Sequence, residues 1–269
     1  MENQSTQQPL DSQQHKNEFA SKKIVKRDFW LIVAYLIVGQ YVFPMIGMMI
    51  GAIVAMSLEI KSDSRINEIG INFATVFGFI GMCLVLLLFY LMHRKTLIPL
   101  AIQRVKDLKK YIVTLIIIIV IMYILNMLYG IMVEFLPEKY QFSDTENNKM
   151  LEKMFTSAWM WPVLFLDIVI VTPIVEELLF RHLLIHELGK KLTYGLMYVV
   201  SILMFAGVHV TEAQSPFELG PYVIMASGFV AAYHLTKRNL AASIALHMIN
   251  NAISFVVILF IIKINYIVI

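Results

Sequence analysis

The sequence predicts an all-α protein, a polytopic bundle of about seven transmembrane helices. Apolar residues make up 59% of the 269 and charged residues 15%, and the mean hydropathy is +0.72. A water-soluble globular domain of this size does not need such a balance. Apolar runs of about 20 residues, the length that crosses a bilayer as a helix, also recur along the chain. They alternate with segments that hold most of the lysines and arginines, as in multi-pass proteins of the cell membrane.

The chain begins with a polar and basic segment, residues 1–28. Its first 20 residues are rich in Gln, Ser and Asn and hold few large apolar side chains, so we expect a disordered tail. The next apolar run begins at Phe29, too deep and too long for a cleavable signal peptide, and is predicted to be a permanent span. A basic collar precedes it and places the amino terminus in the cytoplasm: Lys22, Lys23, Lys26 and Arg27.

The apolar runs predict seven spans, with boundaries uncertain by several residues: 29–56, 71–92, 111–136, 158–189, 194–213, 217–236 and 239–262. The basic residues support this count and its orientation. With the amino terminus inside, 16 of the 22 lysines and arginines fall on cytoplasmic segments. The carboxyl terminus is then outside.

The basic segment 93–110 has two interpretations of equal weight. Its six basic residues lie among Leu, Ile and Val, which fits an amphipathic helix on anionic lipid. The alternative is a plain basic loop that obeys the orientation rule. Elsewhere, the single cysteine, Cys83, excludes an intramolecular disulfide. The net charge of +3 is small and sorted by side of the membrane, which argues against nucleic acid as a partner.

Charged residues inside the fourth predicted span point to function. The segment 171–181 reads VTPIVEELLFR, and charges within a membrane are costly and normally face a protein interior. On a helix, Glu177 and Arg181 share a face, whereas Glu176 points about 100° away from Glu177. We therefore expect Arg181 to be the counter-ion of Glu177, which leaves Glu176 free for chemistry.

Two later spans hold polar pairs four residues apart. The fifth contains Phe205 and His209 in FAGVH, and the seventh contains His247 and Asn251 in HMINN, on a polar stripe with Ser243 and Ser254. Counted from the basic end of each helix at 1.5 Å per residue, these groups and Glu176 lie about 14 to 22 Å deep. One shared site is the better interpretation, provided that the fourth helix continues to about residue 189.

The residue types fit two kinds of hydrolytic chemistry. A carboxylate in a low-dielectric site can act as a general base on water with help from His209, while His247 and Asn251 donate hydrogen bonds to an oxyanion. Alternatively, Glu176, His209 and His247 match the ligand types of a catalytic zinc. The cofactor is therefore either none or one divalent metal. His182 and His186 lack the H-E-x-x-H order and are expected at the membrane interface.

These residues resemble the CAAX-protease and bacteriocin-processing family of intramembrane proteases, also called CPBP or Abi. EELLFR at 176–181 is similar to the family's EExxxR, FAGVH at 205–209 to FxxxH, and HMINN at 247–251 to HxxxN. The resemblance covers about residues 155–262. It implies a protease core at 155–269, preceded by N-terminal transmembrane helices at 29–154. Some members have been described as metalloproteases, and a metal-free glutamate mechanism has also been proposed for the family.

The resemblance also implies a role for each motif residue. Glu176 and His209 would activate water, and His247 and Asn251 would stabilise the oxyanion. Glu177, Arg181 and Phe205 would support the site. These roles belong to an intramembrane endopeptidase of the lipid bilayer that cleaves a hydrophobic, lipidated or membrane-anchored peptide.

The substrate and its pathway are less defined. The Lys-, Ile- and Met-rich composition is typical of low-GC Gram-positive bacteria, where relatives act in peptide maturation, bacteriocin immunity or quorum-sensing peptide processing. The alternative function is a non-catalytic membrane scaffold that binds a sensor protein or peptide. A transporter is disfavoured because no internal repeat is evident. The oligomeric state is left open.

Overall fold

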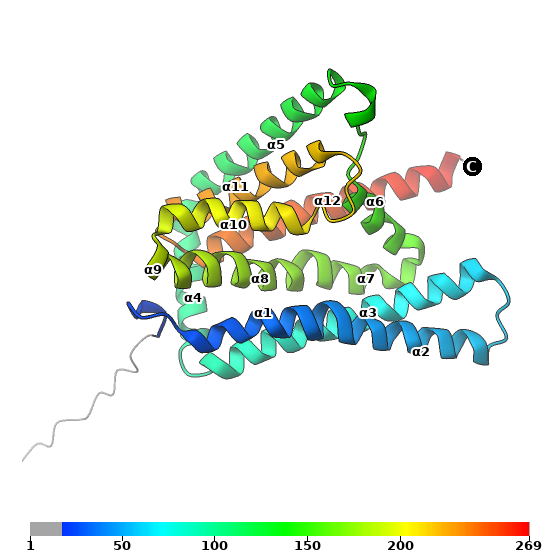
Figure 1. Cartoon of the computed structure of the whole chain (residues 1–269), viewed down its shortest axis with the longest axis horizontal. Coiled ribbons are helices and arrows are strands. Elements are labelled where there is room, and N and C mark those ends of the chain that lie inside the picture. Colours follow the sequence, from blue (N-terminus) through cyan, green and yellow to red (C-terminus); the bar gives the residue numbers. More distant parts are fainter. Residues whose placement is uncertain (1–17, 269) are drawn as a thin grey trace, which may run out of the picture.

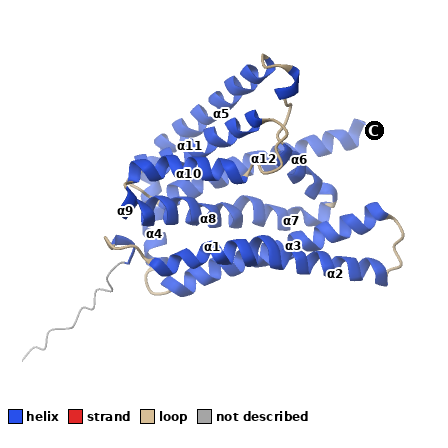
Figure 2. Cartoon of the chain, in the orientation of Figure 1, coloured by secondary structure: helices blue, strands red, loops and turns tan. Residues whose placement is uncertain are grey.

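The computed structural model describes residues 18–268, which form a bundle of helices; no strand occurs in this part of the chain (Figure 2). The predicted all-α fold is confirmed. Of the predicted tail at 1–28, residues 1–17 lie outside the described residues, and the rest contains two short 3-10 helices, Glu18–Ala20 and Lys26–Phe29.

The helices match the apolar runs of the sequence. The first continuous helix consists of α1 (Trp30–Ala34), a π-helical stretch (Tyr35–Val42) and α2 (Phe43–Ser57). A second long helix, 158–192, contains α7 (Trp161–Leu164), α8 (Thr172–Glu177) and α9 (Gly189–Leu192). The other helices are α3 (Asp63–His93), α4 (Leu97–Asp107), α5 (Ile112–Glu134), α6 (Glu146–Glu152), α10 (Tyr194–Val208), α11 (Leu219–Leu235) and α12 (Leu240–Val268).

Four helices of the described chain are long and apolar enough to cross a membrane by length and composition: Lys26–Ser57, Asp63–His93, Leu97–Glu134 and Leu240–Ile264. A shorter apolar helix covers Tyr194–Val208. The protein is therefore a polytopic membrane protein, and the count of seven spans stays a prediction. The helix at 158–192 carries its charges inward, since Glu177 and Arg181 are both fully buried.

Three helix boundaries differ from the prediction by five residues or more, one of them the end of α12, which was expected at 262 and lies at Val268. The second span was expected at 71–92, but α3 begins eight residues earlier, at Asp63. The fifth was expected at 194–213, but α10 ends at Val208. Pro216 lacks a backbone N–H and disfavours a helical conformation in the residue before it, which favours a break between α10 and the next helix. A capping box on Ser215 and Glu218 starts a new 3-10 turn there instead.

The helices run roughly along one direction (Figure 1). At one end lie α4 and α9, and at the other lie α6 and the connection from α2 to α3. The helices and connections at the α4 end hold many basic residues: Arg94, Lys95, Arg104, Lys106, Lys109, Lys110, Lys190, Lys191, Lys237 and Arg238. By the positive-inside rule this end is predicted to be cytoplasmic. The structure adds that segment 97–107 is a helix.

Close packing of α2 on α3 depends on glycine. A Cβ atom on Gly47 would lie 2.4 Å from the Phe73 carbonyl oxygen, and one on Gly51 would lie 3.0 Å from Gly70 Cα. No larger residue fits at Gly47 unless the helices separate. The G-x-x-x-G spacing of Gly47 and Gly51 therefore brings two backbones into contact, as small residues do in membrane bundles.

The helix at 158–192 lies at the centre of the bundle. Its apolar core residues are almost fully buried, whereas α2, α5 and α12 expose rows of Ile, Leu, Val and Met along their outer faces. An exposed apolar row of this length is what a helix presents to lipid. The central helix thus holds its carboxylates in a protein interior rather than against hydrocarbon.

A buried polar network joins the start of the first helix to α3 and the central helix. Asp28, which is fully buried, lies between two histidines: one carboxylate oxygen is 2.9 Å from His93 Nε2 and the other is 2.7 Å from His182 Nε2. Glu187 is also buried and accepts from the backbone N–H of Val25 at 2.7 Å. His182, which was expected at the membrane interface, is held inside this network, with only 4% of the residue exposed.

Candidate active site

Two irregular stretches flank the carboxylate pair on the central helix. Residues 165–171 and 178–188 are π-helical, with α8 between them. Pro173 explains the first stretch, because its ring clashes with the carbonyl four residues earlier and it has no N–H to donate. The helix nonetheless continues to Leu192. The depth calculated for Glu176 required the fourth helix to extend to about residue 189, and the structure meets this requirement.

Glu177 is the more strongly held of the two glutamates. Its Oε1 lies 3.1 Å from Arg181 Nη1 and 3.0 Å from His247 Nδ1. Its Oε2 accepts a short hydrogen bond from the Ser243 hydroxyl. None of the Glu177 side chain is exposed. Three partners on two helices therefore fix this carboxylate, as expected of a support for the site.

Three aromatic rings lie close to the guanidinium group of Arg181. Its guanidinium carbon is 5.0 Å from the ring centroid of Phe205, 5.5 Å from that of Phe229 and 6.0 Å from that of Phe180. The Nε and Nη1 atoms of Arg181 are buried without a hydrogen-bond partner among the described residues. The charge is thus balanced by Glu177 and by the faces of the rings.

Within the described residues, Glu176 has one ion-pair contact, which is to a histidine. Its Oε2 lies 3.6 Å from Nε2 of His247, a distance too long for a good hydrogen bond. The Glu176 residue is 8% exposed and lines a cavity. The two neighbouring carboxylates therefore differ as predicted from their helical positions: one is fixed by partners and the other is open to the cavity.

His209 lines the same cavity from the end of α10. Its Nδ1 lies 2.7 Å from the carbonyl oxygen of Phe205, and because a carbonyl only accepts, Nδ1 carries the hydrogen. The imidazole stacks between the rings of Phe205, at 4.5 Å between centroids, and Tyr222, at 5.0 Å. The ring is held from both sides, and Nε2 has no protein partner in the described chain.

The two polar residues of α12 are placed differently. The His247 ring is stacked on Phe229 with centroids 4.4 Å apart and links the two glutamates through its two nitrogens. Asn251 lines the cavity, but its amide Nδ2 donates to the Ile168 carbonyl at 2.9 Å, so one of its two hydrogens is already used.

The cavity that unites these groups has a volume of about 540 Å³. The structure brings Glu176, Phe205, His209, His247 and Asn251 into its lining, and leaves Glu177 and Arg181 behind the wall. The remaining lining includes Tyr123, Asn126, Asp167, Thr172, Tyr222, Met225, Phe229, Asn250 and Ser254, with side chains of the segment 142–155.

The connection 142–148 forms one wall of the cavity, which the sequence did not reveal. The Thr145 hydroxyl lies 2.7 Å from the Tyr222 hydroxyl, so the wall is bonded to the ring that packs on His209. The nearly buried carboxylate of Glu218 fixes the same wall. It accepts from the backbone N–H of Glu146 at 2.7 Å, Gln214 at 2.9 Å and Ser215 at 3.1 Å.

The residues named for a catalytic zinc are not grouped as ligands among the described residues. No three His, Cys, Asp or Glu side chains of the described residues are grouped as metal ligands. Nδ1 of His247 is bonded to Glu177 and Nδ1 of His209 to a carbonyl, so Nε2 is the nitrogen that each ring could offer to a metal. The set named for a catalytic zinc, Glu176, His209 and His247, is not arranged as ligands in this structure.

Comparison with known proteins gives one match. Residues 158–253 match the family model described as type II CAAX prenyl endopeptidase Rce1-like. This range begins with the central helix and ends within α12, so it contains every residue of the cavity motifs. No curated protein and no solved structure matches the chain.

Proposed function

We propose that this chain, whose residues 158–253 match the Rce1-like CAAX endopeptidase model, is a membrane-embedded protease with Glu176 as its general base. The observation that carries the proposal is the contrast between the two glutamates. Glu177 is saturated by Arg181, His247 and Ser243, whereas Glu176 faces a cavity that it shares with His209.

The proposed reaction is hydrolysis of a peptide bond. Glu176 removes a proton from a water molecule in the cavity, and the water oxygen attacks the carbonyl carbon of the substrate. His209 assists at the free lone pair of Nε2, because its Nδ1 hydrogen is held by Phe205. The tetrahedral intermediate then expels the amine as the C–N bond breaks. The proton taken from water is delivered to the amine nitrogen, which leaves a free carboxylate and a free amine.

Donors for the oxyanion come from α12. When His247 is protonated on both nitrogens, Nδ1 stays on Glu177 and the Nε2 hydrogen is available to the cavity. The second amide hydrogen of Asn251 is available as well, because only one is needed by Ile168. Fixed donors of this kind lower the barrier because they need no reorganisation during the reaction.

The substrate is proposed to be a hydrophobic or lipidated peptide, or a membrane-anchored protein segment. The cavity lies among membrane-spanning helices, and its polar groups are accompanied by Phe205, Phe229, Met225 and Phe255. An extended peptide with apolar side chains suits such a lining. Peptide maturation, bacteriocin immunity and processing of a quorum-sensing peptide are the biological roles proposed for this activity.

Cleavage by purified protein tests the proposal. A panel of lipidated and hydrophobic peptides is incubated with wild type, Glu176→Gln and the control Glu212→Gln, whose side chain is exposed and outside the cavity. We expect wild type and the control to cut, and Glu176→Gln to lose at least 10²-fold in rate. Equal cleavage by all three would refute the base assignment. If cells that carry Glu176→Gln show the wild-type phenotype, the alternative function as a non-catalytic scaffold would be favoured instead.

A further inference from the structure

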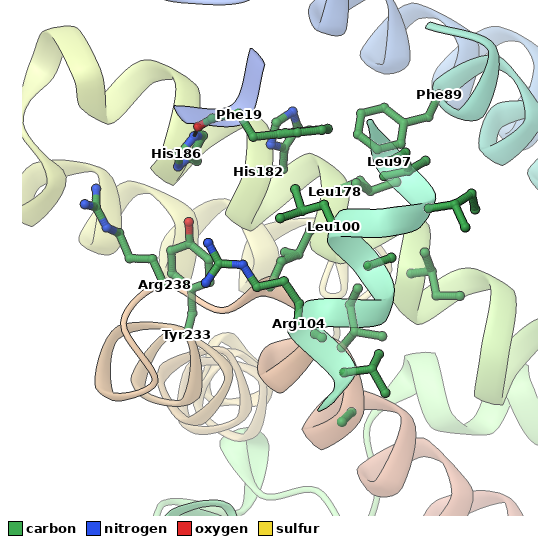
Figure 3. Close-up of a pocket in the computed structure, with 18 of the residues that line it drawn as sticks. Phe19, Phe89, Leu97, Leu100, Arg104, Leu178, His182, His186, Tyr233 and Arg238 are labelled. Atoms are coloured by element: carbon green, nitrogen blue, oxygen red, sulfur yellow. Dashed lines mark hydrogen bonds between the residues drawn. The ribbon is translucent and has the colours of Figure 1, made fainter. Parts of the chain in front are cut away.

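A second cavity, of about 630 Å³, lies at the α4 end of the bundle (Figure 3). It is enclosed by α4, the central helix, the end of α11 and the start of α12. Its lining is almost entirely apolar and includes Leu86, Phe89, Leu97, Leu100, Ala101, Leu108, Ile174, Leu178, Leu240, Ala241, Ile244, Ala245 and Met248. Neither the motif residues nor the proposed reaction uses this space.

Two arginines border the apolar space. Arg104 on α4 and Arg238 before α12 both line the cavity, and in the described chain neither forms an ion pair with a carboxylate. Figure 3 shows both guanidinium groups on the same side of the cavity as the Tyr233 hydroxyl, away from Phe89 and Leu97. This hydroxyl makes no hydrogen bond within the described residues. One side of the cavity is thus rich in unused donors and positive charge.

The local backbone fixes these arginines in place. Asn239, which is buried, donates its amide to the Arg104 carbonyl at 2.9 Å and so ties α4 to the start of α12. The Arg238 guanidinium carbon stacks 4.2 Å from the Tyr194 ring centroid. Both Lys237 and Arg238 adopt a positive φ, 58° and 59°, a conformation that costs energy for residues with a side chain.

An apolar cavity with positive charge at one side matches an anionic amphiphile. Arginine pairs with phosphate through two parallel hydrogen bonds, and the apolar lining matches an acyl chain. The surroundings also favour such a ligand, because α4 exposes Ile98, Ile102 and Val105 at the most basic end of the bundle. Basic segments of this kind attract anionic lipid.

The peptide substrate is a poorer candidate for this space. The two cavities share no lining residue. The helix that presents Glu176 to one cavity presents Ile174 and Leu178 to the other, and α12 likewise divides His247 from Met248. A group held in the second cavity is therefore separated from the open carboxylate by the helices themselves.

We propose that this second cavity binds one anionic phospholipid, with its phosphate at Arg104 and Arg238 and an acyl chain along Leu178, Ala245 and Met248. The proposed lipid site does not depend on whether the protein is a protease. The bound lipid packs directly against the two helices that carry Glu176 and His247, so it supports the catalytic helices from behind.

Photocrosslinking in nanodiscs tests the site. The probe is phosphatidylglycerol with a photoreactive group in one acyl chain, and peptide mapping locates the adduct. The double variant Arg104→Gln/Arg238→Gln is compared with Lys106→Gln/Lys109→Gln, which removes the same charge from exposed residues outside the cavity. We expect adducts on 97–108 and 240–248 in wild type. They should fall about 30-fold in the arginine variant, at about fivefold for each basic side chain, and stay near wild type in the lysine variant.

Additional experiments distinguish a specific lipid site from a diffuse basic surface and from a substrate site. The same probe with a phosphatidylcholine headgroup should label these peptides weakly. Ala245→Trp, which fills the acyl part, should lower labelling while leaving the arginines intact. Thermal unfolding of each variant in phosphatidylcholine confirms folding. Equal losses in the arginine and lysine variants would overturn the proposal in favour of a diffuse basic surface. Displacement of the probe by a lipidated peptide, but not by unlabelled phosphatidylglycerol, would reassign the cavity to the substrate.

Discussion

His247 Nδ1 lies 3.0 Å from Glu177 Oε1, while Nε2 of the same ring lies 3.6 Å from Glu176 Oε2. One imidazole therefore contacts both of the adjacent glutamates, and it is firmly bonded to only one. The ring's orientation is set by Glu177 and by stacking on Phe229. Glu177 thus acts on the site through His247, which explains how a buried ion pair can matter to the chemistry without facing the cavity.

Removal of Arg181 should destabilise the fold. In Arg181→Met the carboxylate of Glu177 loses its cation inside the protein, and breaking one partner of a buried pair costs about 3–5 kcal/mol. Denaturant unfolding in detergent measures the change, with the exposed Arg65→Met as control. The double variant Glu177→Gln/Arg181→Met should recover part of the loss. An Arg181→Met protein as stable as the control would contradict the pairing.

Loss of His209 should affect the chemical step more than binding. We expect His209→Ala to lower kcat by about 10²–10⁴-fold with little change in KM, because the ring assists proton transfer rather than holding the peptide. Initial rates over a range of peptide concentrations separate the two parameters. A raised KM with normal kcat would make His209 a binding residue instead.

Tyr222 should position His209 through its ring rather than through its hydroxyl. Tyr222→Phe keeps the stack at 5.0 Å and removes the bond to Thr145, whereas Tyr222→Leu removes both. We expect a small loss of kcat for Phe and a loss of at least tenfold for Leu. Activity as a function of pH supplies the second readout, since a displaced His209 should alter the profile. Equal effects of the two substitutions would assign the role to the hydroxyl.

Glu218 should control how firmly the 142–148 wall is held. Glu218→Ala leaves three backbone N–H groups without an acceptor, and a buried donor left unpaired, such as the N–H of Ser215, costs about 1–3 kcal/mol. Limited proteolysis should then cut within 141–150 far faster than in wild type. Glu212→Ala serves as the matched control, because its exposed side chain makes no such bonds. Unchanged cleavage would mean that other contacts hold the wall.

Chelation should leave the peptidase activity intact. The cavity groups are not arranged as a ligand set, and the proposed base needs no metal to act on water. Activity is assayed after dialysis against a strong chelator, with metal content measured on the same sample. Loss of activity that returns on addition of Zn²⁺ would replace this mechanism with metal-activated water.

Long apolar runs predicted most of the fold, because lipid exposure demands long apolar helices and basic residues mark one side. Likewise, Glu176, His209 and His247 could be placed together because their depths can be calculated from helix geometry. The wall at 142–148 could not be predicted, since a polar connection gives no sign of what it packs on. Nor could the burial of Asp28 with His93 and His182, because residues far apart in sequence meet there only after the helices pack.

The two π-helical stretches on either side of α8 change the direction in which the following side chains point around the helix axis. A π turn accommodates about one residue more than an α turn, so each stretch rotates the next part of the helix relative to a regular helix. Deleting a single residue between 165 and 171 would rotate Glu176 by about 100° around the helix axis relative to the preceding half of the helix, without removing any motif. Glu176 would then point away from the cavity. The alignment of this catalytic apparatus therefore depends partly on the number of residues in a stretch that carries none of the motifs.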